Sequence, residues 1–170
     1  MTLRGENLWR IARASAPTIV GILGVFLLSS PLRLFQDSLP TPIFPLIVVY
    51  FWSLYSPAHL PAASVFAIGL IQDLLSGGPL GLWPSVYLLV QYLAISQQAY
   101  FLGREWSVVW LGFTVASLVS AAIVWLIMSL LSSALLPIGG LLAQIIVTIA
   151  CFPFFAAAFG NIHRRVVIEV

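Results

Sequence analysis

One acidic side chain, Asp73, stands inside a long apolar stretch of the sequence. A carboxylate within a lipid-spanning segment costs about 2.5–3.5 kcal/mol, so one persists mainly where a partner, a cavity or a function holds it. The residues after it, Ser76, Gly77, Gly78, Pro79 and then Gly81, break a helix, because Pro79 lacks an N–H and disfavours helical backbone before it. We therefore expect a turn directly after Asp73, buried against other helices near one face of a membrane.

Asp73 has three interpretations. It can form an ion pair with Arg33, for which Asp37 competes because it lies four residues after Arg33. It can accept hydrogen bonds from backbone N–H groups in the Gly77-Gly78 turn. It can also be a proton, ligand or partner-contact site, since an ionisable group within a membrane favours a functional role. A tight turn with positive φ at Gly78 would make Gly78→Ala disruptive.

No other residues form a recognisable catalytic or metal-binding set. His59 and His163 have no second ligand at metal spacing, and no serine lies beside a histidine or in a Gly-x-Ser-x-Gly motif. Cys151 is the only cysteine, so an internal disulfide is impossible. Gln91 and Gln144 are expected to hydrogen-bond neighbouring helices. The sequence thus predicts no enzyme, no metal and no cofactor.

The composition is that of an integral membrane protein. Of 170 residues, 61% are hydrophobic and 7% are charged, whereas a typical globular protein has about 25% charged residues. We expect one domain, residues 1–170. The net positive charge of the chain does not indicate a nucleic-acid partner, because the arginines lie mostly at predicted helix ends, where they set the membrane topology.

Hydrophobic runs predict an all-α bundle of six transmembrane helices with a short, broken third helix. A spanning helix needs about 20 apolar residues. The third segment is too short for this, which places Asp73 and the glycine turn below the outer surface, in protein. The six expected spans are residues 16–35, 41–55, 62–75, 82–101, 107–131 and 141–159.

The distribution of arginines predicts the orientation. With six spans both termini share a side, which holds six arginines, while Arg33 alone lies opposite. That side is therefore the cytoplasm, and Asp73 lies toward the outer face. The six are Arg4, Arg10, Arg13, Arg104, Arg164 and Arg165.

From the residues alone two function classes remain: a small-molecule binder or transporter subunit, and a scaffold for other membrane proteins. A longer pattern is more specific. It comprises Pro42-x-x-Pro45-Leu46, Tyr50-x-Trp52, Pro57, Leu60-Pro61, and Gly69-Leu70-x-x-Asp73-Leu74-Leu75-Ser76-Gly77-x-Pro79-Leu80-Gly81 followed by Tyr87.

This pattern, about a third of the chain, resembles the rod shape-determining protein family MreD. One departure is Ser56-Pro57-Ala58-His59, where relatives usually carry an arginine before the proline and an acid after it. This departure puts in doubt a charged contact through the turn. The resemblance implies that the Asp73 to Gly81 motif is a structural or partner-contact feature.

The resemblance also implies a non-enzymatic protein of the bacterial inner membrane that maintains rod shape. Its implied partners are the transmembrane helix of MreC, MreB filaments, RodA with its class B transpeptidase, and membrane lipid. The implied fold is similar to the substrate-binding subunits of energy-coupling-factor vitamin transporters. The alternative function is such a subunit, with an outward-facing pocket lined by Asp73, Gln91 and Gln144.

Overall fold

The computed structural model describes residues 18–26, 41–101 and 105–167, and in this part the chain is helical, with no strand. Residues 18–26 form the first helical segment. The following elements are α2 (Phe44–Tyr55), the 3-10 turn η1 (Pro57–His59), α3 (Ala62–Ser76), α4 (Leu82–Ser96), α5 (Gln98–Phe101), α6 (Trp106–Leu131) and α7 (Gly139–Val167). Arg33 and Asp37, and with them the expected ion pair, lie outside the described residues.

The centre of the bundle is α2. Every side chain from Pro45 to Leu54 is buried, as expected of a helix that is apolar on all sides. Tyr50 makes edge-on ring contacts with Phe113 of α6 and Phe152 of α7, whose rings stack 4.1 Å apart. The aromatic residues of three helices therefore form one core around α2.

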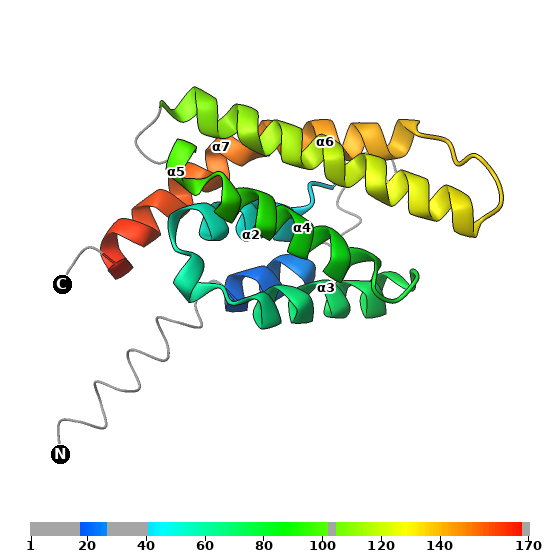
Figure 1. The fold of residues 1–170 in the computed structure, drawn as a ribbon, viewed down its shortest axis with the longest axis horizontal. Coiled ribbons are helices and arrows are strands. Elements are labelled where there is room, and N and C mark those ends of the chain that lie inside the picture. The colour runs from blue at the N-terminus through cyan, green and yellow to red at the C-terminus, as the bar shows by residue number, and fades with distance from the viewer. Residues whose placement is uncertain (1–17, 27–40, 102–104, 168–170) are drawn as a thin grey trace, which may run out of the picture.

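The longer helices run back and forth along one axis (Figure 1). Helices α6 and α7 lie side by side on one flank, α3 and residues 18–26 on the other, and α4 lies between α3 and α6. One end of the molecule carries η1, α5 and the start of α6. The other end carries the α3–α4 turn and the α6–α7 loop.

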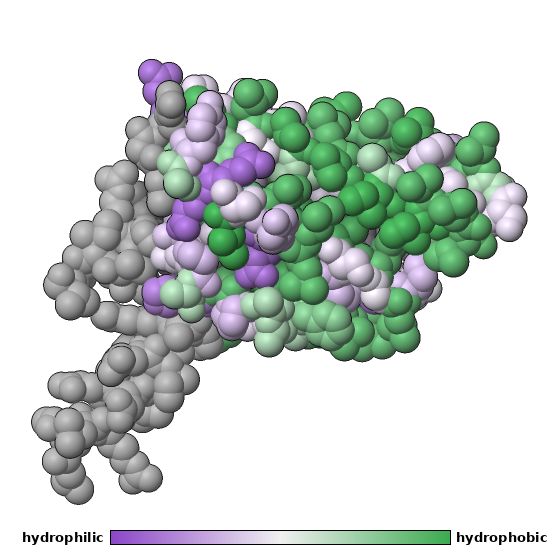
Figure 2. Space-filling view, in the orientation of Figure 1, coloured by the Kyte–Doolittle hydropathy of each residue, from purple (hydrophilic) through white to green (hydrophobic). Residues whose placement is uncertain are grey.

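The surface of the bundle is largely apolar, and polar residues gather at the end where α5 lies (Figure 2). Large exposed side chains along α6 include Leu111, Val115, Leu126 and Leu130. Such a continuous apolar surface marks a membrane or protein interaction face.

By length and composition two of the described helices could cross a bilayer, Trp106–Leu131 and Gly139–Ala158. Helices α2, α3 and α4 have 12, 15 and 15 residues, hence lengths of about 18–22 Å against about 30 Å of hydrocarbon. The bundle of six spans and its likeness to transporter subunits therefore remain predictions.

One expected span is not continuous. The segment 82–101 is divided into α4 and α5, because α4 ends at Ser96 and Gln97 adopts non-helical backbone angles. The Gln98 amide then donates to the Leu54 carbonyl at 2.8 Å. This contact holds α5 against the end of α2.

Polar side chains join the helices at several points, mainly by hydrogen bonds to backbone carbonyls. Gln91 of α4 donates to the Leu60 carbonyl at 2.7 Å, so it bonds a neighbouring segment, although that segment is the turn between η1 and α3 and not a helix as expected. Thr148 of α7 accepts from the Ile43 N–H at 2.9 Å and donates to the Gln144 carbonyl at 2.7 Å. Gln144 thus contributes to this contact through its backbone.

Candidate functional site: the turn between α3 and α4

The end of α3 is built around the backbone carbonyl of Asp73. Gly77 has φ +66°, and its N–H donates to that carbonyl at 3.1 Å. The Ser76 hydroxyl donates to the same oxygen at 3.3 Å. This is the left-handed C-terminal cap that glycine forms at low cost.

The side chain of Asp73 accepts hydrogen bonds from backbone N–H groups at the start of α4. The Gly81 N–H donates to Asp73 Oδ2 at 2.6 Å, and the Trp83 N–H donates to Oδ1 at 3.1 Å. Both carboxylate oxygens are therefore occupied. An acidic oxygen at a helix N-terminus is favourable because the unpaired N–H groups and the helix dipole are positive there.

No N–H is left unpaired in the first turn of α4. The Leu82 N–H donates to the Pro79 carbonyl at 3.3 Å, and the Ser85 N–H donates to the Gly81 carbonyl at 3.2 Å. Pro84, between them, has no N–H to satisfy. With the two bonds to Asp73, every N–H from Gly81 to Ser85 has a partner.

Close contact between α3 and α4 depends on Gly69. A Cβ at Gly69 would lie 2.5 Å from Pro84 Cα and 2.8 Å from the Trp83 carbonyl carbon. Gly69 and Asp73 are four residues apart, so they lie on the same face of α3. The missing side chain lets the first turn of α4 come within reach of the carboxylate.

A buried hydrogen bond between side chains also joins α3 to α4. The Tyr87 hydroxyl of α4 donates to Gln72 Oε1 of α3, and both residues are almost fully buried. Asp73 itself is only 1% exposed. The α3–α4 clasp, which we define as Gly69, Gln72, Asp73, Gly81, Trp83 and Tyr87, is thus a structural unit.

One family model matches the chain, that of the rod shape-determining protein MreD, over residues 13–159. The chain belongs to the MreD family. Neither the curated proteins nor the solved structures contain a match. The matched region includes the whole α3–α4 clasp.

Two expectations about Asp73 differ from the structure. Its N–H partners belong to Gly81 and Trp83, not to the Gly77-Gly78 turn, because α4 begins with its N–H groups directed at the carboxylate. The turn is also not buried as a whole. Leu74 and Leu80 beside it are 65% and 69% exposed, Gly77 is exposed, and Gly78 and Pro79 are half-buried.

The role expected of Gly78 is wrong as well. In the described chain the glycines with positive φ are Gly77 and Gly81, at +66° and +97°. Gly77 ends α3 and Gly81 begins α4, so each lies where the backbone reverses direction. Gly78 lies between these two reversals and needs no left-handed backbone.

The polar groups of the clasp hold α3 and α4 together. Both Asp73 oxygens accept backbone hydrogen bonds, and among the described residues no group of three or more His, Cys, Asp or Glu side chains forms a metal site. The clasp also positions the exposed Leu74, Leu75 and Leu80 around the turn. It therefore fixes the shape of an apolar tip.

The sequence analysis named Gly69 and Tyr87 only as parts of the family pattern, and it assigned no contact between α3 and α4 to Gly69, Gln72, Trp83 or Tyr87. A usable signal was present for Gly69, because a glycine one helical turn before an acid marks a close approach on the acid's own face. Gln72 and Tyr87 carried no such signal, since their pairing depends on how the two helices face each other.

We expect Gly77→Ala to destabilise the protein by about 1 kcal/mol and Gly78→Ala to have little effect. Alanine at Gly77 must adopt φ +66°, which costs an L-residue roughly 1–2 kcal/mol. A Cβ at Gly78 would meet only Ser76 Oγ, at 3.6 Å. Thermal unfolding of the two purified variants in detergent measures the difference, and a larger loss for Gly78→Ala would contradict the assignment of the turn.

Proposed function

We propose that this chain is a non-enzymatic scaffold of the bacterial elongation machinery, binding MreC and linking MreB filaments to lateral peptidoglycan synthesis by RodA and its class B transpeptidase. The observation that carries this proposal is the family match over residues 13–159. The family acts in rod shape determination. The largely apolar surface of the described bundle agrees with a role in holding other membrane proteins.

The flank formed by α6 and α7 is the proposed contact surface for the transmembrane helix of MreC. A spanning partner helix needs about 30 Å of matching apolar surface. Among the described helices, α6 and the apolar part of α7 have that length. Their exposed side chains include Leu118, Leu126, Leu130, Leu142, Ile146 and Phe154.

The proposed location is the bacterial inner membrane, in a multi-pass arrangement with both termini in the cytoplasm. The end of the bundle with η1, α5 and the start of α6 would face the cytoplasm, and the α3–α4 clasp would lie toward the outer face. The polar residues that gather at the α5 end fit an end that lies at a membrane surface (Figure 2), and the distribution of arginines in the sequence favours the cytoplasmic side for it.

The transporter alternative receives no comparable support. It requires an open polar pocket lined by Asp73, Gln91 and Gln144. Asp73 instead caps α4, and the Gln91 amide donates to the Leu60 carbonyl. These contacts use two of the three polar side chains that a vitamin would have to bind.

The test is depletion of the protein in its native rod-shaped bacterium, complemented by variants that carry a photo-crosslinking residue. We expect depleted cells to become round and wild-type protein to restore rods. A crosslinker at Leu126 of α6 should capture MreC. One at Phe66 of α3, which is 47% exposed, is the matched control and should not.

Two outcomes would contradict the proposal. Depleted cells that remain rods and need an external vitamin would favour the transporter alternative. Restored rods without any MreC adduct along α6 or α7 would remove the proposed contact surface.

A further inference from the structure

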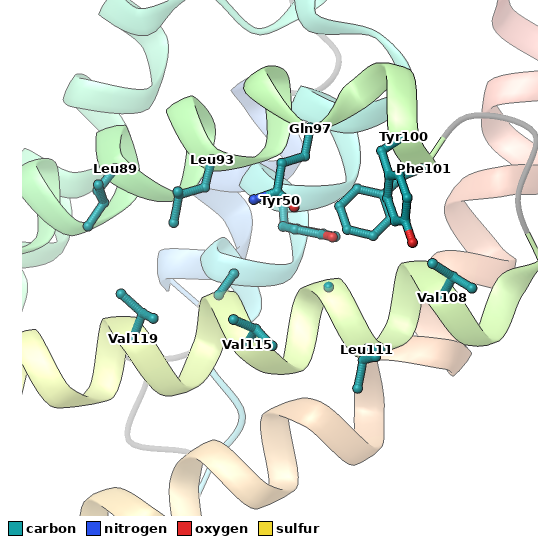
Figure 3. A pocket seen from close by; sticks show the side chains of 12 residues that line it. Tyr50, Leu89, Leu93, Gln97, Tyr100, Phe101, Val108, Leu111, Val115 and Val119 are labelled. Atoms are coloured by element: carbon teal, nitrogen blue, oxygen red, sulfur yellow. The ribbon is translucent and has the colours of Figure 1, made fainter.

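A groove lies between α4, α5 and α6, with its floor on the central helix (Figure 3). Its volume is about 420 Å³, within the roughly 300–1,000 Å³ typical of ligand sites. Side chains from α4 and α6 face each other across it, and Tyr50 of α2 lies between the two helices. Its lining, as far as the described residues go, carries no charged side chain.

The groove has an apolar body and one polar end. Leu89, Leu93, Val115 and Val119 line the body, and Gln97 and Tyr100 lie at the end nearest α5 (Figure 3). That end coincides with the polar end of the molecule in Figure 2. The polarity thus changes along the groove in the way it changes from the interior of a bilayer to its surface.

At the floor of the groove, two aromatic side chains pack closely against α6, and one of them has a weakly bonded hydroxyl. A Cβ at Gly112 would lie 2.6 Å from the Tyr50 hydroxyl and 2.5 Å from Phe101 Cζ, so glycine is what lets both side chains pack against α6. The Tyr50 side chain is 2% exposed. Its hydroxyl donates to the Val109 carbonyl at 3.4 Å, which is long for an O–H hydrogen bond.

We propose that this groove binds one acyl chain of a membrane phospholipid, with the glycerol ester region at the Gln97 and Tyr100 end. The Gln97 amide lies at this end of the groove, and an amide N–H is a donor suited to ester and phosphate oxygens. Among the described residues that line the groove none is charged, which fits an ester region better than an anionic soluble ligand. The site does not depend on whether the chain binds MreC.

Size favours an acyl chain over a partner helix. A transmembrane helix is about 10 Å across and about 30 Å long, far larger than a groove of about 420 Å³. A single acyl chain is only one methylene wide. Partner helices are therefore expected on the outer flank of α6 and α7, and lipid in the groove.

The test is native mass spectrometry of the full-length chain, released from nanodiscs of phosphatidylethanolamine and phosphatidylglycerol. We expect wild-type protein to retain one phospholipid under activation that removes the remaining lipid. Val115→Trp should fill the groove and lower the retained fraction about tenfold, the equivalent of roughly 1.4 kcal/mol.

Leu118→Trp is the matched control, because Leu118 is exposed on the same helix but does not line the groove. It should retain lipid like the wild type. Leu93→Trp fills the groove from α4 and serves if Val115→Trp does not fold. Retention of no phospholipid by the wild type, equal retention by filling and control variants, or a bound molecule of a different mass would each overturn the proposal.

Discussion

Gly69→Ala is expected to destabilise the protein, although alanine normally stabilises a helix relative to glycine by about 1 kcal/mol. The new Cβ would lie 2.5 Å from Pro84 Cα. Carbon atoms prefer a separation of at least about 3.5 Å, so the first turn of α4 must move by roughly 1 Å. We expect a net loss of about 1–3 kcal/mol, as for other overpacked sites, and a larger loss for Gly69→Val.

The same movement should weaken the cap of α4. The hydrogen bonds from Gly81 and Trp83 to Asp73 are 2.6 and 3.1 Å long, and a shift of roughly 1 Å takes both beyond normal hydrogen-bond length. Unfolding by a titrated denaturing detergent, followed by circular dichroism, measures the loss.

Gly140→Ala is the control for this substitution. Gly140 lies in α7, and no atom lies within 4 Å of the Cβ it would gain. This variant should be neutral or slightly more stable. If Gly69→Ala behaved in the same way, the close approach of α3 to α4 would not be tightly packed.

Asp73→Leu is expected to cost about 2–4 kcal/mol, because it removes two hydrogen bonds to an acidic side chain and leaves both N–H donors of α4 unpaired. Asp73→Asn should be milder. Asparagine keeps one acceptor oxygen, but its amide group donates and would face the second N–H. In the native bacterium, cell width measured on the two complemented strains should follow the same order.

Equal damage from Asp73→Leu and Asp73→Asn would contradict this account. It would mean that the charge itself matters, by an ion pair or a charged partner, rather than the two acceptor oxygens. Ser96→Ala is a suitable control for handling, because Ser96 is exposed at the end of α4 and its hydroxyl donates only within its own helix.

The sequence predicts a helix well where an apolar run of helical length is bounded by residues that end helices, such as proline and glycine. Pro61 and Gly77 flank α3, and the structure begins it at Ala62 and ends it at Ser76. The break after Ser96 was not foreseen, since Gln97 and Gln98 are ordinary helix formers. That break depends on the Leu54 carbonyl, a partner 44 residues away, which no local pattern reveals.

The candidate site was found from composition and its geometry was not. An acid before Gly-Gly-Pro indicates a special turn, but the donors depend on where α4 begins. Gly81-Leu82-Trp83-Pro84 does carry that information, because proline is well tolerated in a first helical turn. The predicted start of the fourth helix at Leu82 agrees with the structure, but the pattern did not show that the N–H groups of Gly81 and Trp83 point at the Asp73 carboxylate, because that depends on how α4 packs against α3.

The α3–α4 clasp has a consequence for how the protein is made. Alone, α3 would bring the Asp73 carboxylate into lipid without its donors, and α4 alone would bring two unpaired N–H groups. Each costs several kcal/mol in hydrocarbon. If both helices lie within the bilayer as proposed, they should therefore leave the translocation channel together, as one preassembled hairpin released only after Trp83 has been synthesised.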